Sequence, residues 1–371
     1  MSDLESHHLR QSFAALQPAD ILSAVESLGY LSSGHCEQLN SLENRVYDVR
    51  LEDGRHVVVK FYRPGRWSRS AIQSEHDFLY ELQADEIPVC APLRLADGQS
   101  LHEQAGIFFA LWWRTGGRCL DELGVRQATE LGRLLGRIHN VGARTAFQSN
   151  GRLILNQQSY LIEPLQYLLE NDWPAPEYRH AIEDSALDLA RLYEQAAADI
   201  PLLRIHGDCH IGNLLHSNEG WFFLDFDDCL MGPAVQDFWM LLPGRLVESE
   251  PIVNALLDGY RLFRDFEPGW LGLIEILRAM RYVHYSAWIA RRWHDPAFQQ
   301  AFEHFNTGEY WQNLSQDLRD QLDSCQSAVA PHTLDATIHA GGTEWQANDD
   351  TEALENSAYF YDWTDNGSDP D

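Results

Sequence analysis

The sequence is organised around His206-Gly207-Asp208-Cys209-His210-Ile211-Gly212-Asn213, which the apolar run Trp221-Phe222-Phe223-Leu224 and then Asp225 follow. Residues 214–215 and 221–224 are predicted to form two short strands, because the polar residues between them are typical of a turn. A hairpin of this kind brings Asn213 and Asp225 to the same end of the two strands. We therefore expect an aspartate on a polar turn to lie beside an amide and a second carboxylate.

Oxygen-bearing side chains in this arrangement suit phosphoryl transfer. A γ-phosphoryl group in transfer carries negative charge, so the protein needs Mg²⁺ on oxygen ligands and a free carboxylate that accepts the proton of the attacking hydroxyl. Asp208 would be that carboxylate, and Asn213 and Asp225 would hold the metal, which makes Asp208 and Asp225 the candidate catalytic residues. The alternative is that these are ordinary turn residues and a strand end. The complete constellation favours the site.

Length and composition predict a globular protein of two lobes with an appendage. The 371 residues are 44% hydrophobic and 11% aromatic, which is typical of a folded chain. A net charge of −29 argues against nucleic-acid binding, which depends on clustered basic residues. No apolar run is long enough to span a membrane, and residues 1–5 lack the features of a signal peptide. We expect a cytoplasmic monomer without a membrane partner.

The lysine content points to one position. Among the 27 basic residues only Lys60 is a lysine. Lysine offers a compact ammonium on a flexible stem that the planar fork of arginine does not reproduce. Residues 45–51 and 55–61 are predicted to form a hairpin through Asp53-Gly54, which places Lys60 near the end of the second strand. We infer a functional ammonium there, with chance retention of one lysine as the alternative.

A helix is predicted to follow this hairpin. Residues 68–82 have a helical apolar stripe, and Glu75 falls on that stripe. A carboxylate that faces a core needs a cation, so we expect Glu75 to pair with Lys60. The alternative is a residue at the flank of the helix that reaches water.

The chain is predicted to divide into a β-rich N-lobe (1–113) that binds nucleotide, a mainly helical catalytic C-lobe (114–326) and an acidic disordered tail (327–371). The tail has no lysine or arginine. Trp112 and Trp113 end the N-lobe, where they line an adenine pocket or belong to the core. Asp237 begins a later helix and could cap backbone N–H groups beneath the catalytic turn.

The motifs permit a comparison with a known family. His206-Gly207-Asp208-x-His210-x-x-Asn213, then Leu224-Asp225-Phe226 and Gly232-Pro233-x-x-x-Asp237, resemble the signature of the aminoglycoside phosphotransferase and choline kinase-like family, which is related to the protein kinases. The resemblance covers about residues 20 to 325. It implies an α+β, bilobal protein kinase-like fold, with a small β-rich N-lobe that has one helix and a larger helical C-lobe.

The same resemblance implies roles for individual residues. Asp208 would accept the proton, Asn213 and Asp225 would bind Mg²⁺, and Lys60 would contact the phosphates of ATP and pair with Glu75. Ser41 would lie in the loop over the phosphates, but residues 40–45 contain no glycine, so the backbone nest of a glycine-rich loop is absent. The Ser41 hydroxyl and one or two amides would have to take its place. His206 is interpreted as a packing residue.

Several functions are compatible with these motifs. The leading hypothesis is an ATP-dependent kinase that phosphorylates serine or threonine hydroxyls of a protein, including its own. A small-molecule kinase acting on an aminoglycoside, choline-like or homoserine-like alcohol is the nearest alternative, and Asp227 and Asp228 could contact a cationic acceptor of either sort. Arg278 and Arg281 either meet the substrate or only form salt bridges.

Two hypotheses come from other classes of protein. A metallohydrolase could use His206, Asp208 and His210 with Asp225 and Asp227 as a mixed nitrogen and oxygen site, but it leaves Lys60 and Glu75 unexplained. A pseudokinase that binds a partner and transfers nothing is compatible with the glycine-free loop, although the complete set of base, metal ligands and lysine argues against it.

Overall fold

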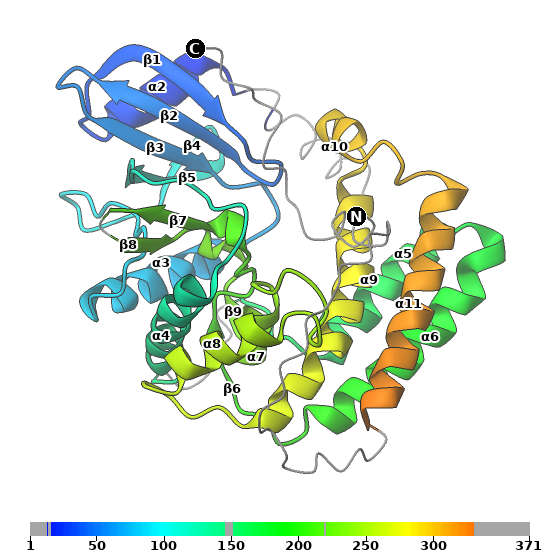
Figure 1. The fold of residues 1–371 in the computed structure, drawn as a ribbon. Coiled ribbons are helices and arrows are strands. Elements are labelled where there is room, and N and C mark those ends of the chain that lie inside the picture. The colour runs from blue at the N-terminus through cyan, green and yellow to red at the C-terminus, as the bar shows by residue number, and fades with distance from the viewer. Residues whose placement is uncertain (1–12, 14–15, 145–150, 219, 330–371) are drawn as a thin grey trace.

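The computed structural model describes residues 13, 16–144, 151–218 and 220–329, which fold into two lobes (Figure 1). A β-sheet with two helices forms one lobe, and the other is mainly helical. The predicted α+β bilobal fold is therefore confirmed. Most of the predicted acidic tail lies outside the described residues, because the description ends at residue 329.

The N-lobe contains an antiparallel five-stranded sheet in the order β1-β2-β3-β5-β4. Its strands are β1 (Ser32–Leu39), β2 (Arg45–Leu51), β3 (His56–Phe61), β4 (His102–Gln104) and β5 (Ile107–Trp113). The predicted hairpin at Asp53-Gly54 joins β2 and β3 and pairs Val46 with Lys60. Val57 and Val59 pack on helix α2 (Pro18–Ser27). Because side chains alternate along a strand, Lys60 is directed to the opposite face of the sheet, toward the C-lobe.

Two parts of the N-lobe differ from the prediction. Strand β1 was not expected, because Ser32–Leu39 is mostly polar and exposed and therefore lacks the alternation of a half-buried strand. The sequence from 84 to 113 predicts further strands that complete the N-lobe, but within 84–92 Val89 makes only an isolated bridge to Phe223 of the C-lobe. The backbone partner of Val89 lies 134 positions later in the chain, beyond the reach of any local sequence pattern.

Helix α3 (Arg69–Ala84) connects the two lobes. Its first turn is capped by the Ser68 hydroxyl, which accepts a hydrogen bond from Ala71 N. The predicted apolar stripe is buried, and Phe78, Leu79 and Leu82 join the core of the C-lobe. Helix α3 therefore holds the sheet at a defined position relative to the catalytic residues.

The C-lobe is built from helices with two short pairs of strands inserted among them. Its helices are α4 (Val125–Gly142), α5 (Glu163–Glu170), α6 (Pro176–Ala196), α7 (Val235–Trp239), α8 (Glu250–Tyr260), α9 (Ile274–Arg292), α10 (Pro296–Ala301) and α11 (Gly308–Val329). Its strands are β6 (Leu202–Ile205), β7 (Leu214–Ser217), β8 (Gly220–Phe223) and β9 (Leu230–Pro233). The strands pair as β6 with β9 and β7 with β8. The predicted catalytic hairpin is thus the β7–β8 pair.

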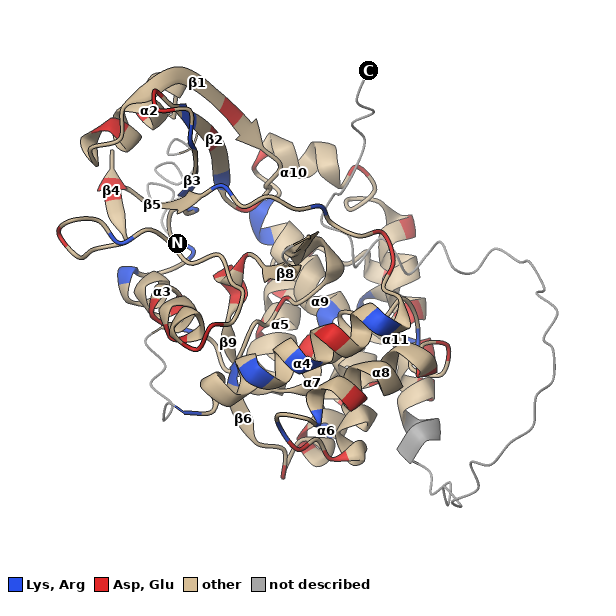
Figure 2. Cartoon of the chain, turned by 60° about the vertical axis from the view of Figure 1, so that its left-hand side comes forward, with Lys and Arg blue, Asp and Glu red and all other residues tan. Residues whose placement is uncertain are grey.

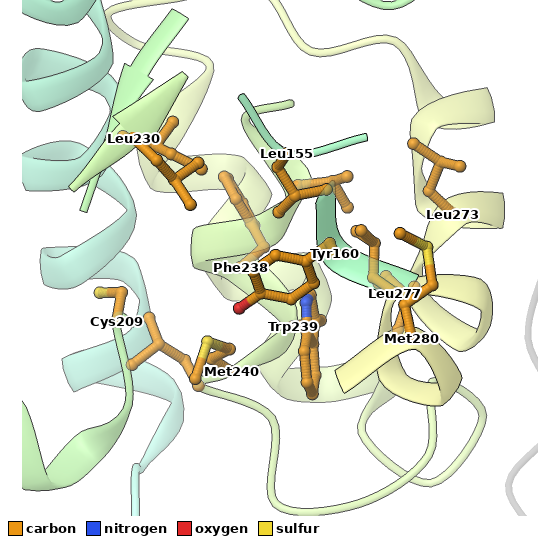
Figure 3. Close-up of a cluster of buried hydrophobic side chains, with 14 of the residues drawn as sticks. Leu155, Tyr160, Cys209, Leu230, Phe238, Trp239, Met240, Leu273, Leu277 and Met280 are labelled. Carbon is orange, nitrogen blue, oxygen red and sulfur yellow. The ribbon is translucent and has the colours of Figure 1, made fainter. Parts of the chain in front are cut away.

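A large apolar core lies beneath the catalytic turn. Figure 3 shows Phe238 and Trp239 of α7 in the middle of this core, with Cys209 on one side and Leu277 and Met280 of α9 on the other. All five are buried. The turn that carries Asp208 is therefore seated on packed side chains, which limits its movement.

Charged residues are spread over both lobes, on helices as well as on loops (Figure 2). Among the described residues, no helix is long and apolar enough to cross a membrane.

Candidate active site

The turn after β6 holds Asp208 through its backbone. The two carboxylate oxygens of Asp237 accept hydrogen bonds from His206 N and Gly207 N, each at 2.8 Å. Asp237 itself is fully buried and also lies 3.0 Å from Nε2 of His139. Asp237 thus lies beneath the catalytic turn and satisfies two of its N–H groups, as the sequence suggested.

Gly207 is required by this geometry. Its φ is +84°, and a Cβ at this position would lie 2.4 Å from the carbonyl oxygen of Asp228. We expect Gly207→Ala to destabilise the protein by about 2 to 5 kcal/mol, because backbone strain and a steric clash add together. The matched control is Gly98→Ala, where φ is +79° and nothing lies within 4 Å of the added Cβ. Thermal unfolding of both variants measures the difference, and equal losses of stability would contradict the role of the clash.

His206 connects the catalytic turn to the second aspartate. Its Nε2 donates a hydrogen bond to the carbonyl of Leu224 at 2.7 Å, and its Nδ1 accepts one from Asp208 N at 3.3 Å. The ring also packs against Phe226. The interpretation of His206 as a packing residue was therefore incomplete. Since both ring nitrogens are already bonded and the residue is fully buried, the metallohydrolase hypothesis receives no support from this histidine.

The hairpin brings Asn213 and Asp225 together, as predicted. Leu224 N donates to the carbonyl of Asn213 at 2.9 Å, which continues the pairing of β7 with β8. The side-chain nitrogen of Asn213 donates to the carbonyl of Asp208, also at 2.9 Å, and this bond leaves the amide oxygen available as a ligand. Asp225 has the left-handed conformation, with φ of 50° and ψ of 67°. An amide oxygen and a carboxylate at one end of a hairpin are suitable ligands for Mg²⁺.

Lys60 reaches the same end of the hairpin from the N-lobe. Its Nζ lies 2.7 Å from Oδ1 of Asp225 and 3.2 Å from Oδ1 of Asp227. Burial of the ammonium opposes its charge, but the carboxylates of Asp225 and then Asp227 outweigh burial and raise the pKa of Lys60 above its ordinary value. The structure therefore brings the only lysine of the chain to the proposed metal ligands as a cation.

Glu75 does not pair with Lys60, contrary to the prediction. Its carboxylate accepts a hydrogen bond from the Arg152 guanidinium at 3.0 Å, and no ion pair between Glu75 and Lys60 occurs among the described residues. Burial raises the pKa of Glu75. The pairing differs because Lys60 already forms ion pairs with Asp225 and Asp227. Arg152 is held beside Glu75 by its hydrogen bonds to a carbonyl oxygen of α3 and to the carbonyl oxygen of Asp227.

Asp227 joins the two lobes and was not recognised as a structural residue from the sequence. Its side chain is only 3% exposed, and Oδ2 accepts hydrogen bonds from Arg66 at 2.6 Å and from Asn44 at 3.2 Å. Arg66 also pairs with Asp228 at 2.5 Å. The suggestion that these two aspartates contact a cationic acceptor is not supported for Asp227, which is buried against cations of the chain itself, while Asp228 pairs with Arg66 and has a side chain that is 43% exposed. The sequence marked these aspartates only by their place after Asp225.

An arginine and a histidine flank the proposed base. Arg281 of α9 places Nη1 3.0 Å from Oδ1 of Asp208, and His210 places Nε2 3.6 Å from Oδ2. Burial favours protonation of Asp208, but Arg281 and then His210 outweigh it and hold the pKa of Asp208 well below its usual range. Of the two arginines noted in the sequence, Arg281 reaches the base, whereas Arg278 lies 3.4 Å from Glu275.

This arrangement predicts a pH effect of Arg281. In Arg281→Gln the positive charge is lost while burial stays, so the pKa of Asp208 should rise and the protonated, inactive form should persist to higher pH. We expect the acidic limb of the pH profile of kcat to move to higher pH, with less change near neutral pH. The profile of Arg278→Gln, a change on the same helix away from Asp208, serves as the control. An acidic limb identical to that of the wild type would contradict the expectation.

A cleft of about 980 Å³ lies between the lobes, and these residues line it. Its lining includes Ser41, Lys60, Asp208, Asn213 and Asp225. Trp112 and Trp113 also line it. Trp112 packs against a small core cluster of the N-lobe as well, whereas Trp113 is exposed, so each of the two interpretations holds in part. Ser41 Oγ accepts a hydrogen bond from Asn44 N at 3.3 Å, which leaves its hydroxyl hydrogen free to donate.

A two-lobed fold with a lysine, an asparagine and two aspartates at the inter-lobe cleft defines a kinase-type phosphotransferase. The chain belongs to the phosphotransferase enzyme family, whose sequence model matches residues 35–274. Stress response kinase A of Escherichia coli strain K12 is 41% identical over 302 residues, which cover 81% of this chain and 90% of that protein. Serine/threonine protein kinase RdoA of Salmonella typhimurium is 40% identical over 312 residues, covering 84% and 94%.

Solved structures confirm the fold. The chain resembles amicoumacin kinase hAmiN with a TM-score of 0.68 and 18% identity, over 85% of this chain and 96% of that one. It resembles a microcompartment-associated aminopropanol kinase with a TM-score of 0.62 and 18% identity, over 82% and 96%. Family membership and fold together make this chain an ATP-dependent kinase.

Proposed function

We propose that this chain transfers the γ-phosphoryl group of ATP, with Mg²⁺, to serine or threonine hydroxyls of a protein in a bacterial stress response. The observation that carries the proposal is the convergence of Lys60 on Asp225, within the cleft that Asp208 also lines. Two relatives that share about 40% identity over most of the chain bear the names of a stress response kinase and a serine/threonine protein kinase.

In the proposed reaction Asp208 accepts the proton of the acceptor hydroxyl as its oxygen forms a bond to the γ-phosphorus and the bond from that phosphorus to ADP breaks. The low pKa of Asp208 keeps the base ionised before the acceptor arrives. Lys60 would hold the phosphates of ATP, and the Ser41 hydroxyl would donate to a phosphate oxygen. Asn213 and Asp225 would hold Mg²⁺, which neutralises charge on the phosphates when it is bound.

The charges beside Asp208 favour a protein acceptor over an aminoglycoside or a choline-like alcohol. A polycationic or quaternary ammonium acceptor would have to approach a base whose two oxygens face Arg281 and His210. Asp227 and Asp228, which could have attracted it, pair with Arg66 instead. Like charges at close range are repulsive, so these acceptors are disfavoured.

A labelling experiment distinguishes the two kinds of acceptor. The chain is incubated with Mg²⁺ and γ-labelled ATP, with either a protein extract of the encoding bacterium or a panel of aminoglycosides, choline and homoserine. We expect label on protein serine or threonine, including sites on the chain itself, and labelling at least about 100-fold slower with Asp208→Asn. A metabolite phosphorylated at a physiological rate without any protein label would overturn the proposed acceptor while retaining the kinase activity.

A further inference from the structure

The loop between β1 and β2 lacks glycine, yet it lines the cleft where the phosphates of ATP would lie. Residues 39–43 all face this space. A glycine-rich loop binds phosphates through closely approaching amides, so this loop needs another means to hold its backbone in place. The contacts of Glu43 and Arg63 provide one.

Arg63 holds the backbone of the loop from behind. Its guanidinium donates hydrogen bonds to the carbonyl oxygens of Glu43 at 2.8 Å and Leu42 at 2.9 Å. The N–H and C=O groups of a trans peptide point in opposite directions. The amide N–H of Glu43 is therefore directed away from Arg63.

The side chain of Glu43 crosses to the other lobe. Its carboxylate accepts a hydrogen bond from Trp288 Nε1 at 2.7 Å and contacts Arg292 with an N–O distance of 2.5 Å, both on α9. Arg63 and Arg66 of the N-lobe lie 3.2 and 3.6 Å from the same carboxylate. We call these five residues the Glu43 anchor. Burial opposes ionisation of Glu43, but Arg66, Arg292 and Arg63 lower its pKa below the ordinary value, so the anchor holds a charged group.

Helix α9 connects this anchor to the catalytic base. Arg281, Trp288 and Arg292 are spaced by seven and four residues, which places them on one face of the helix. The first contacts Asp208 and the other two contact Glu43. Figure 1 shows α9 running through the C-lobe to α10, beside the end of β1 where the loop begins. Asp295, the cap of α10, adds a contact to Arg63 at 3.2 Å.

We propose that Glu43 is a positioning residue that fixes the glycine-free loop over the phosphates of ATP by anchoring it across the cleft to α9. The inference rests on the proposed function, because it assumes that ATP occupies this cleft. The Glu43 anchor makes the loop more rigid than an N-lobe hairpin alone would be, because Trp288 and Arg292 of the anchor lie on α9 in the packed C-lobe. Nucleotide and base are then set relative to the same helix.

The test compares two ligands that differ in their phosphates. The dissociation constants of a non-hydrolysable ATP analogue with Mg²⁺ and of adenosine are measured by calorimetry for the wild type and Glu43→Gln, which keeps the size of the side chain but removes its charge. We expect affinity for the ATP analogue to fall at least about tenfold, a typical effect of removing a charge from a buried pair, while affinity for adenosine stays within about twofold. A purely structural role would weaken both ligands alike.

Two further variants complete the design. Arg292→Lys keeps the positive charge but loses the fork that grips Glu43, so it should show the same selective loss and keeps the inference testable if Glu43→Gln does not fold. Glu81→Gln breaks another pair between the lobes, to Arg204 at 3.0 Å, away from the loop. It should change neither affinity.

Equal losses for both ligands, or no loss for the ATP analogue, would overturn the positioning role. Failure of the proposed function looks different, because a wild-type chain that binds the ATP analogue but labels no acceptor would contradict phosphoryl transfer without changing the comparison between the two ligands.

Discussion

Asp208→Asn is expected to lower kcat by about 10²- to 10⁴-fold, the usual contribution of a general base. Asparagine has nearly the same shape but cannot accept the proton of the acceptor hydroxyl. The carbonyl of residue 208 would still accept a hydrogen bond from Asn213, and Gly207 N would still donate to Asp237, so the turn should stay in place. Affinity for ATP should change by less than about threefold, because the base faces the acceptor and not the nucleotide.

Steady-state kinetics with labelled ATP measure the loss, and calorimetric titration with a non-hydrolysable analogue measures binding. Asp188→Asn, which changes a half-exposed aspartate on α6 paired with Arg191, is the control for the chemical change itself. Autophosphorylation by Asp208→Asn at the wild-type rate would remove Asp208 from the role of base.

Lys60→Met should have the second largest effect, and it should act on both activity and stability. The variant loses the ammonium between Asp225 and Asp227, so two carboxylates face each other across the site without their shared cation. We expect kcat/KM for ATP to fall by about 10²- to 10³-fold, as when one preorganised electrostatic group is removed. Stability should fall by about 1 to 3 kcal/mol, less than for an isolated buried pair, because Arg66 and Asn44 still bond Asp227.

Lys60→Arg separates charge from shape. It retains a cation between the carboxylates, so it should recover most of the stability. It should not recover activity, because a planar fork at the end of a buried strand cannot take the position of the ammonium. Denaturant unfolding and ATP kinetics are measured for both variants. Wild-type kinetics in Lys60→Met would contradict the assignment, and full activity in Lys60→Arg would show that the single lysine of this chain was retained by chance.

Local patterns in the sequence were sufficient for most of the fold. The alternation of the hairpin around Asp53-Gly54 and the helical spacing of apolar residues in α3 are both visible within a few residues of sequence. The structure contains both elements. The catalytic hairpin was predictable for the same reason, because Asn213 and Asp225 are neighbours through a short turn. Strand β1 was not predicted because its residues are mostly polar and exposed. Its strand conformation depends on backbone pairing with β2, which leaves no hydrophobic pattern in the sequence.

The partners of the charged residues could not be predicted in the same way. The single lysine among 27 basic residues was noticeable because it is rare, whereas no local pattern distinguished Arg66, Arg152 and Arg292 from the other arginines. The expected pair of Glu75 with Lys60 failed for this reason, because the competing cation, Arg152, lies 77 positions away in the chain.

Sequence alone was thus enough for the kinds of chemical groups at the site and for their local supports, because a turn, a hairpin and an amphipathic helix are set by interactions over a few residues. Only the tertiary structure decided which cation neutralises which carboxylate. Glu43 and Arg292 are 249 positions apart, and Lys60 and Asp225 are 165 apart. Such pairs form because folding removes the Lys60 ammonium and the Glu43 carboxylate from most of their water, and a buried charge must be neutralised by a partner that the packed lobes bring to it.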